Sequence, residues 1–172
     1  MPRVNTPASA HAGPAAAAGW QWQAFGNASY LAAVNSAIAT INTRIRGIAT
    51  CDAAFRALPG GKTFSQVWAD PTVWISYDPT PTAQRYGATL GKEVTLSQYT
   101  CKMGSWTIVA TLIHELAHVN GADGISNDAE STLQHCLMKD HYNPAIIGNI
   151  IRAKQANWEI AALSRSWRCR AS

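Results

Sequence analysis

Residues 108–118 constrain the fold of this chain more than any other segment. They read Ile-Val-Ala-Thr-Leu-Ile-His-Glu-Leu-Ala-His, an apolar stretch that ends in two histidines and a glutamate. The apolar run is far shorter than the ~20 residues that cross a bilayer. Leu112 and Leu116 are spaced as on a buried helix face, whereas His114 and His118 lie on a different arc. We therefore expect a packed helix and no membrane span.

The spacing of the two histidines favours a metal site. Residues four apart on a helix lie on one face, about 6 Å apart along its axis. The imidazoles of His114 and His118 can thus converge on one Zn²⁺ at ~2.0–2.1 Å. Glu115 follows the first histidine directly, so its carboxylate projects beside the metal, where a general base is needed. The alternative interpretation is two core histidines and a surface glutamate on a packed helix.

A catalytic zinc site needs a third protein ligand, and the sequence leaves several candidates open. Glu130 is the first choice, on the opening turn of the next expected helix. With Asn127 it also has the spacing of a capping box, which is its structural alternative. Asp128 and Asp123 are the other candidates, although either can be an ordinary acid near a helix start. His135 lies about 140° around the helix from Glu130 and is less suited.

Stabilisation of an oxyanion needs a further donor. His141 and Tyr142 follow the motif in the segment Asp140-His-Tyr-Asn143 and are the candidates for this role. A loop pair without a catalytic role is the alternative.

The remaining elements indicate an α+β fold. Apolar residues at spacings of three and four predict a helix over 28–58, stopped by Pro59-Gly60-Gly61. The other expected elements are a helix over 63–69, strands over 72–77 and 92–97, the motif helix over 106–120, and helices over 127–139 and 144–164. Ser105 suits the N-cap of the motif helix and Gly121 its C′ position.

Residues 1–19 read as a flexible linker rich in Ala and Pro, and residues 20–172 as one domain. The N-terminal stretch lacks the apolar core of a cleavable signal peptide. Four cysteines, with no Cys-x-x-Cys pair, argue against a cysteine zinc site. We expect Cys51 to pair with Cys101 and Cys136 with Cys169, as in an oxidising compartment, with four reduced thiols as the alternative.

The chain carries 14 Lys and Arg against 10 Asp and Glu, a net charge of +4. The basic residues are scattered, whereas nucleic-acid interfaces cluster them with aromatics or a known motif. We therefore expect no nucleic-acid partner.

The segments 110–122 and 128–136 resemble zincin metallopeptidases, and in particular the compact metallopeptidase domains of bacterial polymorphic toxins and secretion-system effectors. That resemblance implies a small antiparallel or mixed sheet packed on helices, with the motif on a central active-site helix. It also implies His114, His118 and Glu130 as zinc ligands and Glu115 as the base. Gly124 stands where the extended metzincin pattern needs histidine, which excludes that class. Deuterolysin-like aspzincins, which would use the aspartates, are the second resemblance.

Motif and resemblance together predict a monomeric zinc-dependent metallopeptidase acting on a protein or peptide. The resemblance implies secretion, or delivery by a secretion system, and an immunity or inhibitor protein as partner. The alternatives are an amide hydrolase of cell-wall peptides and a non-catalytic zinc-stabilised binding module.

Overall fold

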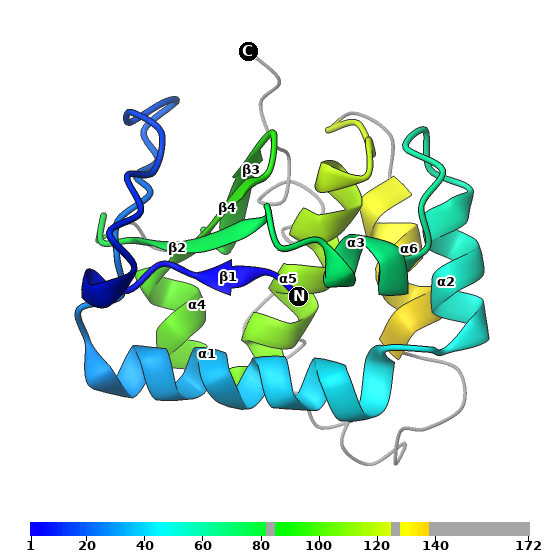
Figure 1. The fold of residues 1–172 in the computed structure, drawn as a ribbon, viewed down its shortest axis with the longest axis horizontal. Coiled ribbons are helices and arrows are strands. Elements are labelled where there is room, and N and C mark those ends of the chain that lie inside the picture. The colour runs from blue at the N-terminus through cyan, green and yellow to red at the C-terminus, as the bar shows by residue number, and fades with distance from the viewer. Residues whose placement is uncertain (82–84, 125–127, 138–172) are drawn as a thin grey trace, which may run out of the picture.

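The structure is a computed structural model, and it describes residues 1–81, 85–124 and 128–137. The strands and α-helices of the described residues are β1 (Arg3–Val4), α1 (Ala28–Thr40), α2 (Ala49–Arg56), α3 (Phe64–Ala69), β2 (Trp74–Asp78), β3 (Gly87–Leu90), β4 (Glu93–Ser97), α4 (Gln98–Met103), α5 (Ser105–Val119) and α6 (Asp128–Leu137). They form the expected α+β arrangement of helices and one mixed sheet (Figure 1). The expected helix over 144–164 lies outside the described residues.

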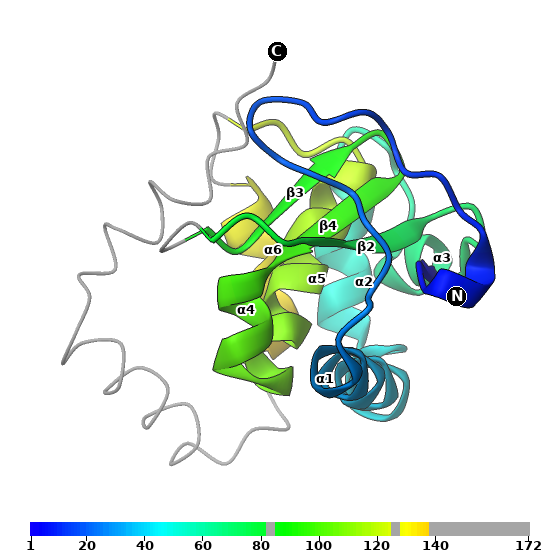
Figure 2. The same cartoon turned by 90° about the vertical axis from the view of Figure 1, so that its left-hand side faces the viewer.

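The sheet has the order β1-β2-β4-β3. β2 pairs in parallel with β1 and with β4, whereas β3 and β4 form an antiparallel hairpin. Helices α1, α4 and α5 lie on one face, and the N-terminal segment crosses the other (Figure 2). α5 therefore lies at the centre, between the sheet and the surrounding helices.

The core explains why α5 takes this place. Nine of its residues, from Ile108 to Ala117, are buried, so the helix is enclosed on nearly all sides. α1 packs on it with a stripe of Val34, Ala37 and Ile38, as the apolar spacing predicts. α5 begins at Ser105, with Gly104 in the N-cap position expected for Ser105. Such a shift of one residue is within the ordinary variation of helix boundaries.

The single helix expected over 28–58 is divided. α1 ends in a π-helical turn over Ile41–Ile45, and Arg46 leaves the helical region. Gly47 then adopts a φ of 87°, a left-handed conformation that favours glycine. The break redirects the chain, so that α2 packs against α6 instead of continuing α1 (Figure 1).

Residues 1–19 differ from the expected flexible linker, because several of them bind the sheet. The backbone N–H groups of Arg3 and Asn5 donate to the carbonyls of Val73 and Ile75, each at 2.8 Å. The His11 ring stacks on Trp74 at 3.8 Å. The content of Ala and Pro did not predict these contacts, because they are made by a few isolated residues.

The disulfide pairing expected from the sequence is wrong. Cys51 on α2 is bonded to Cys136 on α6, 85 residues later. Cys101 lies on α4 and is a buried free thiol, and burial raises its pKa to about 12. Because α2 and α6 pack side by side, the two cysteines on them meet, an arrangement that spacing along the chain does not reveal. Cys169 lies outside the described residues.

Candidate metal centre

His114 and His118 meet on the inner side of α5, as their spacing predicts. Their Nε2 atoms lie 3.1 Å apart, and their ring centroids are 4.8 Å apart. His114 is 1% exposed, whereas His118 is half-buried. One histidine is therefore fixed in the core, and the other opens towards the surface.

The partner of His118 determines which of its ring nitrogens carries the proton. Nδ1 lies 2.8 Å from the carbonyl oxygen of Ala122. A carbonyl oxygen only accepts hydrogen bonds, so Nδ1 is the donor, and in the neutral ring Nε2 carries the lone pair, which accepts a hydrogen bond from Nε2 of His114 at 3.1 Å. That lone pair points towards Nε2 of His114. A backbone carbonyl on the distal nitrogen is a common outer support of metal-binding histidines.

The distance between the two nitrogens fits a shared metal ion. Two ligands of a tetrahedral zinc, each at ~2.0–2.1 Å, lie about 3.3–3.4 Å apart. The observed 3.1 Å is close to that value. Within the described residues, no group of three or more His, Cys, Asp or Glu side chains is gathered closely enough to hold a metal ion. Within the described residues, the candidate metal centre therefore consists of His114 and His118, without a third side chain close enough to complete it.

Glu115 is buried beside the two histidines, at 3% exposure. The Thr89 hydroxyl lies 2.7 Å from its Oε2 and 3.1 Å from its main-chain oxygen. Burial raises the pKa of the Glu115 carboxyl to about 8, the hydrogen bond from Thr89 lowers it, and the charge of Glu130 raises it. Without a nearby cation, this carboxyl keeps its proton at neutral pH.

The strand β3 approaches α5 closely because Gly87 has no side chain. A Cβ atom at this position would lie 2.8 Å from Thr111 Cγ2 and 2.9 Å from Glu115 Oε1. Sequence reasoning missed both β3 and Thr89. One signal was available: Leu90 and Glu93 flank the two residues Gly91-Lys92, a typical hairpin connection.

Asn120 joins the end of α5 to the last turn of α2 and to the loop between α2 and α3. Its side chain, 2% exposed, donates to the carbonyls of Phe55 and Lys62 at 2.8 and 2.9 Å. Its own carbonyl accepts from Gly60 N at 2.8 Å. A Cβ on Gly60 would lie 2.5 Å from Asn120 Oδ1. The glycine predicted to stop a helix thus also allows this contact.

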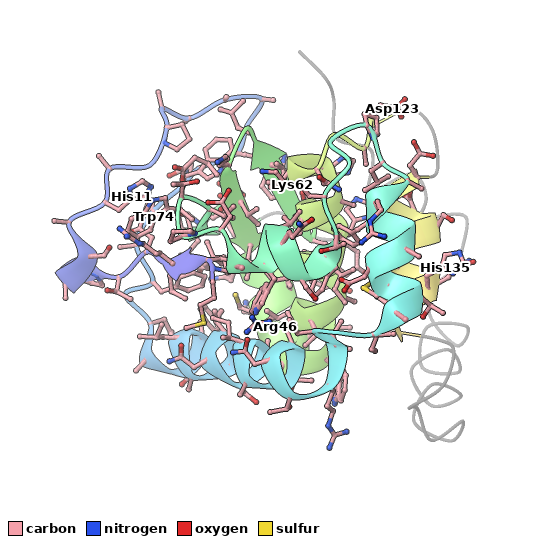
Figure 3. The ribbon with its side chains drawn as sticks, turned by 45° about the vertical axis from the view of Figure 1, so that its right-hand side comes forward. His11, Arg46, Lys62, Trp74, Asp123 and His135 are labelled. Atoms are coloured by element: carbon pink, nitrogen blue, oxygen red, sulfur yellow. A yellow bond between two sulfur atoms is a disulfide. The ribbon has the colours of Figure 1, made fainter. Side chains whose placement is uncertain are left out.

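The candidates for the third ligand lie at or before the start of α6. Asp128 and Glu130 are on its first turn, both half-buried. Glu130 is near enough to Glu115 to raise the pKa of that carboxyl. Asp123 is exposed on the loop that follows α5 (Figure 3).

The other sequence candidates lie elsewhere. His135 is on the last turn of α6, and its ring points outward from that helix (Figure 3). Its carbonyl accepts a hydrogen bond from the Thr50 hydroxyl at 3.0 Å. His141 and Tyr142 lie outside the described residues.

Comparison of the chain with protein-family models, with curated proteins and with solved structures finds no match in any of the three. Across residues 1–81, 85–124 and 128–137, no helix has the length and apolar character needed to span a membrane.

Proposed function

We propose that this chain is a zinc-dependent metallopeptidase. The proposal rests on one observation: the Nε2 atoms of His114 and His118 lie 3.1 Å apart, and the buried carboxyl of Glu115 is on the same helix. Two imidazoles and a carboxylate at this spacing are the residue types that metal-assisted hydrolysis uses.

His114 and His118 would hold the zinc through their Nε2 atoms. Glu130 is the proposed third ligand, supported by its place on the first turn of α6 and by its electrostatic effect on Glu115. Asp128 and Asp123 are the alternatives. When bound, zinc supplies a Lewis acid that polarises a carbonyl and lowers the pKa of water.

Glu115 would move the proton in the reaction. Its carboxylate accepts a proton from the attacking water and then delivers it to the leaving amine. A buried position excludes bulk water from this transfer, and Thr89 holds the carboxylate by a hydrogen bond. His141 and Tyr142 remain the proposed donors to the oxyanion.

We further propose a zincin-like architecture and a secreted or delivered effector that acts on proteins or peptides as a monomer. The central helix beneath a small mixed sheet supports the first part. The Cys51–Cys136 disulfide is compatible with an extracellular protein, since such bonds persist in oxidising environments. An immunity or inhibitor protein is the proposed partner.

The variant Glu115→Gln tests the proposal. It should keep its zinc, measured by elemental mass spectrometry, and lose cleavage of fluorescein-labelled casein by about a hundredfold or more, because the base is gone. Glu93→Gln is the matched control, since Glu93 lies on β4 and contacts His11. That variant should cleave normally.

Equal cleavage by Glu115→Gln and the wild-type protein would contradict the proposal. If the zinc-loaded wild type leaves casein intact but digests purified cell-wall sacculi, the substrate is a cell-wall peptide. Zinc binding without either activity would favour a non-catalytic module.

A further inference from the structure

We propose that Thr89 is a positioning residue for Glu115, and that Thr89 and Gly87 together form a cradle that holds the Glu115 carboxylate in one place. The inference rests on the proposed function, since it assigns Glu115 a reaction. The contact itself does not depend on that function: Thr89 Oγ1 lies 2.7 Å from Glu115 Oε2. We use "carboxylate cradle" for these two residues of β3.

The two residues of the carboxylate cradle hold different oxygens of the same group. Thr89 donates a hydrogen bond to Oε2. Oε1 lies over Gly87, where a Cβ atom would be only 2.9 Å away. Since residues two apart on a strand face the same side, one short strand controls both oxygens.

β3 is suited to this task because its position is well determined. Its register with β4 pairs Gly87 with Leu96 and Thr89 with Val94, both buried on β4. Gly91, with a φ of 62°, closes the hairpin. The carboxylate cradle therefore belongs to a strand that is held in place by its pairing with β4. Such rigid elements position reacting groups more precisely than loops do.

The Glu115 side chain needs such a restraint. Its flexible chain has several rotamers, and a buried polar group without a hydrogen bond is costly. The Thr89 hydroxyl also lies 3.1 Å from the main-chain oxygen of Glu115, so it contacts both the backbone and the carboxyl group of this residue. Loss of the hydroxyl would free the carboxylate to leave the position needed for proton transfer.

Two substitutions of Thr89 distinguish the effect of its hydroxyl group from the effect of its side-chain packing. Thr89→Val keeps the branched shape and removes the donor, whereas Thr89→Ser keeps the donor. Thr95→Val is the matched control, because Thr95 is buried on the adjacent strand and donates to the Gln21 carbonyl at 2.7 Å. Thr95 pairs with Ala88, so it faces the side of the sheet opposite the carboxylate cradle.

The first measurement is independent of activity. The ¹³C chemical shift of the Glu115 carboxyl carbon, identified by its absence in Glu115→Gln, is recorded in the metal-free protein. Thr89→Val should change this shift, and Thr89→Ser and Thr95→Val should leave it close to wild type. An unchanged shift in Thr89→Val would overturn the inference whether or not the protein is a peptidase.

The second measurement is the cleavage of labelled casein by the zinc-loaded variants. Thr89→Val should lower kcat by about tenfold to a hundredfold, because small misplacements of a reacting group have effects of this size. Its KM and zinc content should stay near the wild-type values, and Thr89→Ser should recover most of the activity. If Thr95→Val loses as much kcat as Thr89→Val, the effect is structural and the inference fails. An inactive wild type would instead contradict the proposed function.

Discussion

His118 donates its Nδ1 proton to the carbonyl oxygen of Ala122 at 2.8 Å, within the turn that ends its own helix. The N–H of Ala122 in turn donates to the carbonyl of Ala117 at 2.9 Å. The C-terminal turn of α5 is therefore both a helix cap and the support that orients the ring of His118. This relationship makes the metal centre sensitive to residues that do not touch a metal.

Substitution of Gly121 by alanine should weaken both stability and zinc binding. Gly121 has a φ of 89°, and a Cβ there would lie 3.2 Å from Gly60 N and 3.3 Å from Pro59 Cβ. Left-handed backbone costs a non-glycine residue about 1–2 kcal/mol, before any crowding. Displacement of the Ala122 carbonyl should raise the dissociation constant for zinc by about tenfold or more.

Gly61→Ala is the matched control for this prediction. Gly61 also has a positive φ, of 65°, but no heavy atom lies within 4 Å of the position of its Cβ. Urea denaturation should show a loss of about 1 kcal/mol in this variant, with zinc affinity unchanged. Equal zinc affinity in Gly121→Ala and Gly61→Ala would show that the helix cap does not support His118.

Removal of the Cys51–Cys136 disulfide should destabilise the protein markedly. The bond closes a loop of 85 residues and anchors α6, the helix that carries Glu130. A crosslink over a long loop stabilises by about 2–5 kcal/mol. The double variant Cys51→Ser/Cys136→Ser should show this loss in urea denaturation, whereas Cys101→Ser should retain the bond.

Peptide mapping without reductant checks the pairing itself. Digestion should yield one linked pair of peptides that contain Cys51 and Cys136, and Cys101 should be alkylated only after unfolding. A linked peptide pair that contains Cys51 and Cys101 would contradict the structure.

The contribution of Glu115 to the stability of the metal-free protein should fall as pH rises between about 4 and about 8. Burial raises the pKa of Glu115 to about 8 in the folded state, while an unfolded glutamate titrates near 4.3. The unfolded state therefore releases its proton first, and the folded state binds more protons across this window. Below about pH 4, Glu115 is protonated in both the folded and the unfolded state, so its contribution to the free energy of unfolding has its full value there.

Glu115→Gln should lack this component of the pH dependence. The difference in unfolding free energy, wild type minus variant, should decrease from about pH 5 to about pH 8 in urea denaturation with a chelator present. Parallel pH profiles for the two proteins would mean that Glu115 is not the buried acid described here.

Much of the fold could be predicted from local pattern. The motif helix, expected over 106–120, spans Ser105–Val119, and Gly121 takes the expected left-handed turn. The strands expected over 72–77 and 92–97 correspond to Trp74–Asp78 and Glu93–Ser97. Periodic apolar residues carry this information, because each element must bury one face.

The missing parts depend on contacts between distant segments. β3 has only four residues, including Gly87 and Ala88, so it lacks a strong apolar alternation. The partner of Cys51 is set by the packing of α2 on α6, which spacing along the chain does not encode. The meeting of His114 and His118 was predictable because both lie on one helix; the hydrogen bond from Thr89 to Glu115 was not, because it joins two elements.

The most direct test of the central claim is the zinc content per chain after preparation with added zinc. Wild type, His118→Ala and Glu130→Ala are measured in one series by elemental mass spectrometry. We expect about one zinc per wild-type chain, very little in His118→Ala and a large loss in Glu130→Ala. Full zinc in Glu130→Ala alone would move the third ligand to Asp128 or Asp123. Full zinc in His118→Ala, or no zinc in the wild type, would show that His114 and His118 do not form a zinc site.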